Sequence, residues 1–178
     1  RIYDQAGQTG NLVKDWTFIV SSTLTSNYSE NWPPDFAAAK EGVNYVSVRL
    51  YDRAGLTAAV NDVFYVKKDT SVPVITDNQA GDAAWKNAPG TVYNLDFRDL
   101  ASGLTTIQYQ ISTTPAQGSP PIKDWTNIVP DLAGQAEYLS DWPLDFSALY
   151  EGVTNYVTVR AFDQLSQATT VQDVFYIL

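Results

Sequence analysis

Four stretches in the C-terminal half of the chain alternate hydrophobic and polar residues and are rich in β-branched and aromatic side chains. They are Val92 to Phe97, Thr105 to Ile111, Asn155 to Phe162 and Thr169 to Ile177. Alternation with a period of two is typical of β-strands that bury one face. Clusters of Asn, Asp, Gly and Pro separate these stretches and favour turns. The pattern predicts an antiparallel β-sandwich.

The sequence also predicts a tyrosine corner and a short turn near the ends of particular strands. Gly152 and Tyr156 have the spacing of a tyrosine corner, in which a Tyr hydroxyl bonds to backbone a few residues upstream. In the first half, Gly55 can supply the positive φ that a short turn at residues 52–55 requires. Ser166 occupies the equivalent place in the second half, so we expect that turn to be built differently.

A long part of the sequence occurs twice in the same order, which marks a duplicated unit. The sequence Lys-Asp-Trp-Thr at residues 14–17 returns at residues 123–126. Further matches are Trp32 with Trp142, Asp35 with Asp145, Glu41 with Glu151, Asn44 with Asn155, Arg49 with Arg160, Asp52 with Asp163 and Asp62 with Asp173. We therefore expect residues 1–68 to be the C-terminal part of one immunoglobulin-like repeat, and residues 69–178 to be a complete one.

The first copy has no counterpart of residues 71–109. One interpretation is that the chain is a window cut from a longer array of repeats. The other is that the first unit is an incomplete sandwich, which strands of a neighbouring molecule complete. The expected partners are therefore neighbouring repeats or copies of the chain itself, with strand exchange in the second case.

The best-repeated residues also resemble a known family. The segments Glu41–Gly55 and Phe64–Thr70, with Val72 and Pro73 opening the next unit, resemble the bacterial immunoglobulin-like, Big-type repeats of large surface proteins, and more distantly fibronectin type III modules. The resemblance covers essentially the whole chain. It implies an all-β fold of tandem immunoglobulin-like antiparallel β-sandwiches, the first incomplete at its N-terminus. It also implies an extracellular or cell-surface location and a role as stalk, adhesin or filament subunit.

Composition narrows the range of partners. The formal net charge is −9, with only 11 Lys and Arg residues, so we expect no basic face for nucleic acid or anionic lipid. No apolar run approaches the ~20 residues of a membrane helix, so we expect no membrane insertion in this segment. The absence of Cys and His removes most familiar catalytic groups, and no nucleophile is paired with a base. We predict that the protein is not an enzyme.

Acidic residues near the predicted junction are candidate ligands for a structural calcium ion. They are Asp69, Asp77, Asp96 and Asp99. Hard carboxylate oxygens gathered from two loops suit Ca²⁺ and could stiffen a linker, although their spacing matches no EF-hand. Apart from this calcium, the sequence predicts no cofactor.

Tryptophan side chains are candidate platforms for sugars, because sugars stack on exposed aromatic rings. Trp16, Trp32, Trp125 and Trp142 recur with their neighbours, so we expect them in the core. Trp85 lies in a polar, loop-like stretch and is the candidate binding residue. Our main hypothesis is a structural repeat module of an extracellular stalk or filament. The alternative is an adhesin-type module that recognises a glycan or protein through sandwich-end loops, around Trp85 or residues 115–121.

Overall fold

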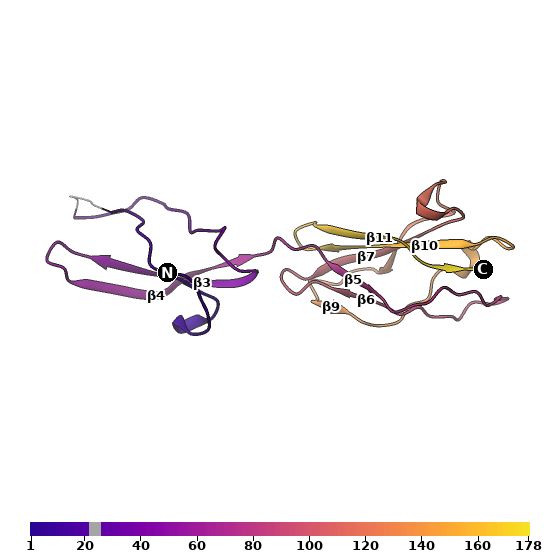
Figure 1. The fold of residues 1–178 in the computed structure, drawn as a ribbon, viewed down its shortest axis with the longest axis horizontal. Helices are drawn as coiled ribbons and strands as arrows, with labels where there is room; N and C mark the ends of the chain where they lie inside the picture. The colour runs from indigo at the N-terminus through magenta and orange to yellow at the C-terminus, as the bar shows by residue number, and fades with distance from the viewer. Residues whose placement is uncertain (22–25) are drawn as a thin grey trace. The chain divides into compact units, whose positions relative to one another are not determined.

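The computed structural model describes residues 1–21 and 26–178. The chain divides into two compact units, Arg1–Thr70 and Ser71–Leu178, here called unit 1 and unit 2 (Figure 1). The boundary expected from the sequence lies two residues earlier, between residues 68 and 69. All pairings between the described strands are antiparallel, and the fold is all-β.

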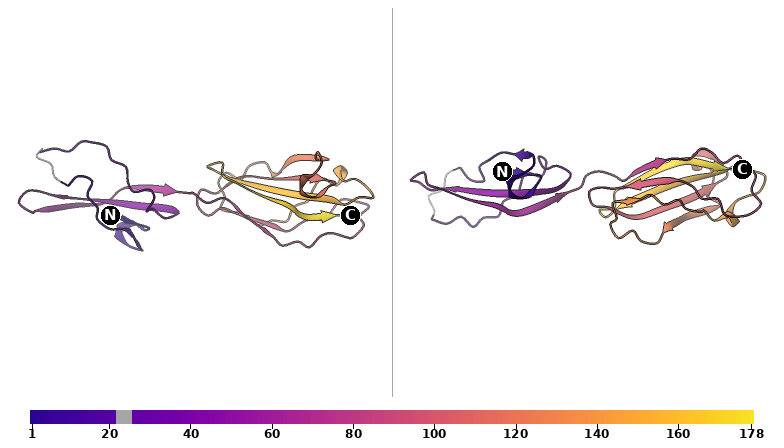
Figure 2. Two further views of the ribbon diagram at one scale, coloured as in Figure 1. Left: turned by 45° about the horizontal axis from the view of Figure 1, so that its top comes forward. Right: turned by 90° about the horizontal axis from the view of Figure 1, so that it is seen from below.

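Unit 2 contains two sheets, which form two layers in Figure 2. The first has the order β11-β10-β7-β8, with β7 at Leu104–Ser112, β8 at Lys123–Val129, β10 at Asn155–Asp163 and β11 at Ala168–Ile177. The second has the order β5-β6-β9, with β5 at Val74–Asp77, β6 at Leu95–Arg98 and β9 at Glu137–Tyr138. This arrangement is consistent with a β-sandwich.

One hydrophobic core lies between the two sheets of unit 2. Val157, Val159 and Ala161 of β10 are fully buried, which follows from their alternation along the strand. Leu95 and Phe97 of β6 join the same cluster from the other sheet. The central strand β10 therefore has a covered face and paired neighbours on both edges.

Three of the four strands expected from the sequence are confirmed, to within a residue or two, as β7, β10 and β11. The remaining one, β6, begins at Leu95 rather than Val92. Upstream of β6, Tyr93 forms only an isolated bridge with Trp142. The Tyr93 ring stacks on Phe175, with 4.4 Å between the ring centroids, so aromatic packing holds this segment where regular strand pairing stops.

Unit 1 contains one sheet, with the order β2-β1-β3-β4, and its long strands form a single layer in Figure 2. Its strands are β1 at Ile2–Tyr3, β2 at Leu12–Lys14, β3 at Gly42–Tyr51 and β4 at Thr57–Lys68. Ile2 pairs with both Lys14 and Val46, which is the pairing that Ile111 makes in unit 2. The described residues of unit 1 form no second sheet.

Short 3-10 helices recur at matching places. Helix η1 spans Ala6–Gln8 and helix η2 spans Pro115–Gln117. A third, η3, spans Phe146–Ala148, and the Asp145 side chain caps it by accepting a hydrogen bond from the Ser147 amide. The capping follows the ordinary preference for Asp at this position.

The turn at Ser166 has the same form as the turn at Gly55, contrary to our expectation. The Gly55 amide donates to the Asp52 carbonyl at 3.2 Å, and the Ser166 amide donates to the Asp163 carbonyl at 3.3 Å. The φ angle is 83° at Gly55 and 64° at Ser166. The Asp163 carboxylate accepts two amide hydrogen bonds within its turn, which helps to offset the cost of a left-handed serine.

The expected tyrosine corner is wrong, because Asn155 makes the tie instead of Tyr156. The Asn155 amide nitrogen donates to the carbonyls of Tyr150 at 3.0 Å and Val153 at 3.1 Å, and its oxygen accepts from the Tyr150 amide at 2.9 Å. The Tyr156 hydroxyl makes no hydrogen bond within the described part of the chain. Asn44 repeats the asparagine tie in unit 1. An asparagine carries a donor and an acceptor together, so it can bind both backbone groups of the loop.

Removing this tie should destabilise unit 2. We expect Asn155→Ala to lower the free energy of unfolding by about 2–4 kcal/mol, because it leaves several buried backbone groups unpaired. Tyr156→Phe is the matched control and should cost less than about 0.5 kcal/mol. Urea denaturation followed by the NMR signals of unit 2 checks both variants. Equal losses of unfolding free energy in the two variants would contradict the asparagine tie.

Candidate functional site

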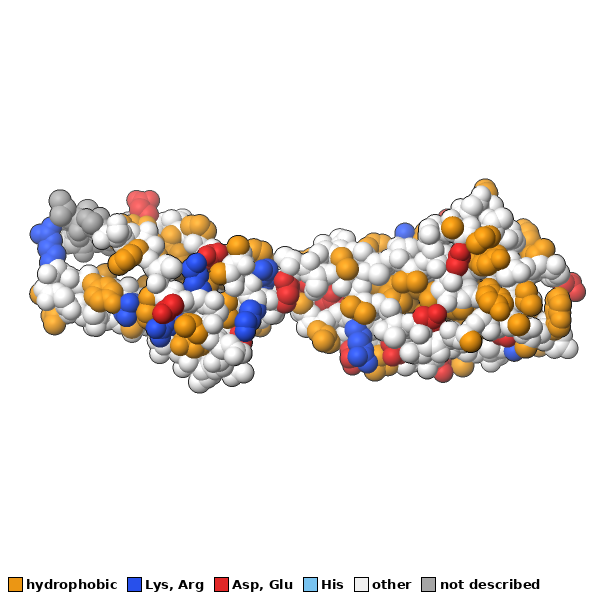
Figure 3. Space-filling view, in the orientation of Figure 1, with side chains coloured by type: hydrophobic (Ala, Val, Ile, Leu, Met, Phe, Trp, Pro, Cys, Tyr) orange, Lys and Arg blue, Asp and Glu red, His pale blue; other side chains and the backbone are white. Residues whose placement is uncertain are grey.

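Equivalent hydrophobic positions of the two units differ greatly in exposure. Ala161 of β10 is fully buried, whereas Leu50, its counterpart in β3, is 68% exposed. Phe175 of β11 is 3% exposed and its counterpart Phe64 in β4 is 36% exposed. Figure 3 shows hydrophobic side chains at the surface of unit 1. A sheet face that belongs to the core in unit 2 is therefore surface in unit 1.

A groove of about 1500 Å³ adjoins β3 in unit 1 and is lined by residues from both faces of the sheet, including Leu50 on one face and Trp16 on the other. Its lining includes residues 46–53, which cover most of β3, and residues 16–21, 28–30 and 32–35. In unit 2, β7 lies between β10 and β8, and residues 123–129 of β8 are the counterpart of residues 14–20. The groove lies where unit 2 has β7, and Arg1 aligns with Gln110 near the end of that strand.

The edge of β3 beside the groove is also open. Ser47 exchanges two backbone hydrogen bonds with Arg1, at 3.0 and 3.2 Å, and the pairing with β1 goes no further along β3. Backbone groups of alternate residues point to the same edge of a strand. The main-chain groups of Arg49 and Tyr51 therefore face the groove, where no described strand pairs with them.

A lysine–aspartate ion pair recurs beside this sheet in both units. Lys14 pairs with Asp35, and Lys123 pairs with Asp145 at 2.8 Å. The hydrogen bond from Lys123 holds the pKa of Asp145 below its usual value, and Asp145 raises the pKa of Lys123. Lys14 likewise lowers the pKa of Asp35. Both pairs are partly exposed, so they contribute modestly to stability and serve to hold neighbouring segments together.

The candidate calcium ligands occupy different environments. In unit 2, Asp77 and Asp96 lie on the paired strands β5 and β6, whereas Asp99 is buried and accepts hydrogen bonds from two backbone amides. Asp69 follows β4 at the end of unit 1. Sequence reasoning missed Asp163, a buried turn residue whose carboxylate oxygens come within 4.8 Å of those of Asp99. Calcium at Asp99 stays a prediction.

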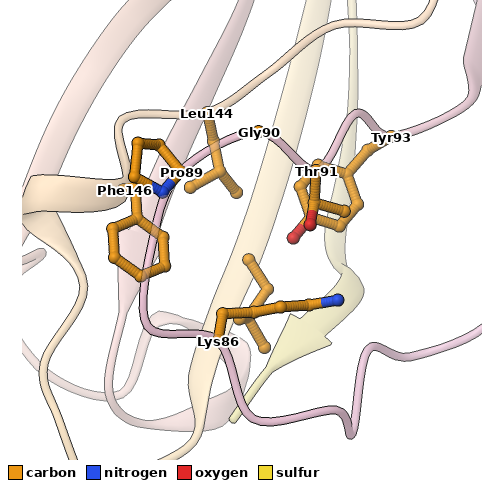
Figure 4. A pocket seen from close by; sticks show the side chains of 8 residues that line it. Lys86, Pro89, Gly90, Thr91, Tyr93, Leu144 and Phe146 are labelled. Carbon is orange, nitrogen blue, oxygen red and sulfur yellow. The ribbon is translucent and has the colours of Figure 1, made fainter.

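Trp85 offers an exposed ring. Trp85 belongs to the segment that connects β5 and β6, and its side chain is 76% exposed. A hollow beside the next residue, Lys86, has a volume of about 10 Å³ and is lined by Pro89, Tyr93 and Leu144 among others (Figure 4). A volume of that size holds about one water molecule. Recognition of a glycan by Trp85 stays a prediction and would have to use an open surface.

Most of the repeated tryptophans are not in the core. Trp142 is buried in the core of unit 2, as expected. Trp125 is partly exposed, with the Arg160 guanidinium 4.0 Å from its ring centroid. Trp16 and Arg49 repeat this contact at 4.3 Å in unit 1. The expectation of core positions for Trp16 and Trp125 is wrong, because cation–π stacking holds these rings on the outer face of each sheet.

Comparisons with known proteins add no relative. No protein-family model matches the chain, and no curated protein matches its sequence. Within the part of the chain that the structure describes, no helix is long and apolar enough to cross a membrane.

The ion pair of unit 2 should make stability fall in acid. Because the folded pKa of Asp145 lies below its ordinary value of 3.8, its stabilisation is fully present above that value and is lost as the pH falls through the folded pKa. We expect Asp145→Asn to lose less stability than the wild type on acidification. Urea denaturation at a series of pH values checks this, with Asp141→Asn as control. If the free energy of unfolding of the wild type and of Asp145→Asn fell equally as the pH is lowered, the stabilising role of the Asp145 ion pair would be contradicted.

Proposed function

We propose that the chain is a structural repeat segment of an extracellular surface protein and forms part of a stalk or filament. The observation that carries this proposal is the repeated framework. Both units have the same strand register, lysine–aspartate pair and asparagine tie. A chain that repeats its framework rather than a reactive site is suited to spanning distance. Its partners, on this proposal, are neighbouring repeats.

The residues at the link between the units support a stiff spacer. In unit 1, the Thr70 amide and hydroxyl both donate to the Glu41 carboxylate, at 2.8 and 2.5 Å. In unit 2, the Thr169 hydroxyl donates to the Pro73 carbonyl at 2.5 Å. Only Ser71 and Val72 lie between these anchored positions. Pro73 fixes its own φ and Val72 is β-branched, which restricts the backbone at these two residues and favours the proposed spacer.

Loosening the anchor should let the units move separately. We expect wild-type units 1 and 2 to have nearly equal rotational correlation times, close to that of the whole chain, in ¹⁵N relaxation measurements. Glu41→Ala should shorten both times, because it frees Thr70. Glu151→Ala, at the equivalent place in the second repeat, should leave them unchanged. Independent tumbling of the two units in the wild type would count against the stiff spacer.

The second candidate function is an adhesin-type module, and the exposure of Trp85 favours it. Binding to a glycan array that Trp85→Ala abolishes would support this function. Leu165→Ala, which changes another exposed hydrophobic residue, should leave such binding intact. Binding that survives Trp85→Ala would remove Trp85 from the proposal.

A further inference from the structure

The first segment of unit 2 runs alongside β11, the last strand of the same unit. At the start of β11, the Thr169 hydroxyl donates to the Pro73 carbonyl at 2.5 Å. Near the end of β11, the Asp82 amide donates to the Tyr176 carbonyl at 2.8 Å, and the Leu178 amide donates to the Asp82 carbonyl at 3.2 Å. The pairings between the named strands are antiparallel, whereas this bridge is parallel. The incoming segment is therefore tied to β11 at two points, and both run in the same direction.

The Asp82 side chain fastens this bridge to the core of unit 2. Its carboxylate accepts hydrogen bonds from the Ala84 amide at 3.2 Å and the Tyr93 hydroxyl at 3.3 Å, and Lys86 Nζ lies 3.6 Å from it. Burial, with the nearby Asp82 carboxylate, raises the pKa of Tyr93 to about 12, so the hydroxyl keeps the proton that it donates. The Tyr93 ring in turn stacks on Phe175 of β11. Backbone and side chain of Asp82 thus connect the same segment to β11.

The residue before Asp82 allows a close approach to β11. Gly81 lies against the Tyr176 ring, and a Cβ atom at this position would be 2.0 Å from the ring carbon Cε1. Any side chain here would have to displace the ring. A glycine within an extended segment is typical of places where another part of the chain comes this near.

Tension along the chain would act directly on this contact. The link from unit 1 joins unit 2 at the end opposite to the C terminus (Figure 1). Because the incoming segment and β11 are parallel, pulling these two ends apart slides one along the other. The two backbone hydrogen bonds of Asp82 lie across the direction of sliding, so they are loaded together. In a hairpin pulled open from its end, by contrast, the bonds break one after another.

We propose that the bridge from Asp82 to Tyr176 and Leu178, here called the Asp82 latch, is the element of unit 2 that resists stretching. Under tension, the rest of the unit stays folded until the two backbone hydrogen bonds of the latch break. This inference rests on the proposed stalk function, because only a chain that carries tension makes use of such a contact. It deepens that function by assigning the resistance to one bridge rather than to the core as a whole.

A latch has a kinetic signature that ordinary stabilisation lacks. Contacts that are broken in the transition state of unfolding control the unfolding rate, whereas contacts still intact there affect mainly refolding and equilibrium stability. Forced unfolding depends on the unfolding rate. Ile128 offers a comparison, because it lies on β8, at the opposite edge of the sheet from β11, and packs against the core. Its contacts should still be intact when the latch breaks.

The test stretches unit 2 within the full chain at constant force. Since the chain has no cysteine, Val72→Cys and a cysteine added after Leu178 can carry the two handles. Asp82→Pro removes the amide that bonds to Tyr176. We expect this variant to unfold about tenfold faster than the wild type at the same force, because the latch loses a backbone hydrogen bond and its side-chain support.

Two further variants separate the latch from other effects of substitution. Ala88→Pro is the matched control in the same segment, because the Ala88 amide donates to no other described residue and Pro89 already favours an extended backbone there. It should unfold at the wild-type rate. Ile128→Ala should lower the free energy of unfolding measured in urea, yet change the unfolding rate under force by less than about twofold.

Two results would overturn the proposal: a wild-type unfolding rate under force in Asp82→Pro, or equal acceleration by Asp82→Pro and Ile128→Ala. If Asp82→Pro does not fold, a second pulling direction decides the matter. Handles at Asn87→Cys and after Leu178 load the latch from one end, so unit 2 should unfold at a lower force than in the first direction, and equal forces would contradict the latch. Failure here leaves the tumbling measurement, and hence the stalk proposal, unaffected.

Discussion

A central strand in a sandwich has three surfaces to satisfy: two edges that carry backbone hydrogen-bonding groups and one hydrophobic face. In unit 2, β10 meets all three demands, because β7 and β11 pair with its edges and the β5-β6-β9 sheet covers its face. In unit 1, the equivalent strand β3 pairs fully only with β4. The groove and the exposed Leu50 both follow from this one difference.

The sequence predicted the sheets well because hydrophobic alternation and repetition report directly on strands. The alternation of Val157, Val159 and Ala161 located the core face of β10, and the repeat located its counterpart in unit 1. These inferences needed only local periodicity and comparison of the chain with itself.

Other features depend on contacts that no local pattern contains. The Arg160 and Gln108 pair joins residues 52 positions apart, so only the register of β7 and β10 reveals it. Asn155 looked like an ordinary strand residue, although it rather than Tyr156 ties the loop. The repetition of Trp125 with its neighbours suggested a core position. A sequence pattern does not show that the Arg160 guanidinium covers the Trp125 ring. Asp163 was assigned to a turn, and its approach to Asp99 depends on the packing of two separate loops.

The repeated framework is the property that the two units share. It holds each unit in shape through the same asparagine tie and lysine–aspartate pair, which is what a spacer requires.

Hydrogen exchange of the free full chain, followed amide by amide, tests the central claim most directly. The account predicts that the amides of Arg160 and Phe162 in β10 are protected until unit 2 unfolds, because they pair with β7. It predicts that their counterparts Arg49 and Tyr51 in β3 exchange at least a hundredfold faster, as expected for an unpaired edge that opens without global unfolding. Equal protection at the two pairs of positions would show that the edge of β3 is already occupied and would contradict the account.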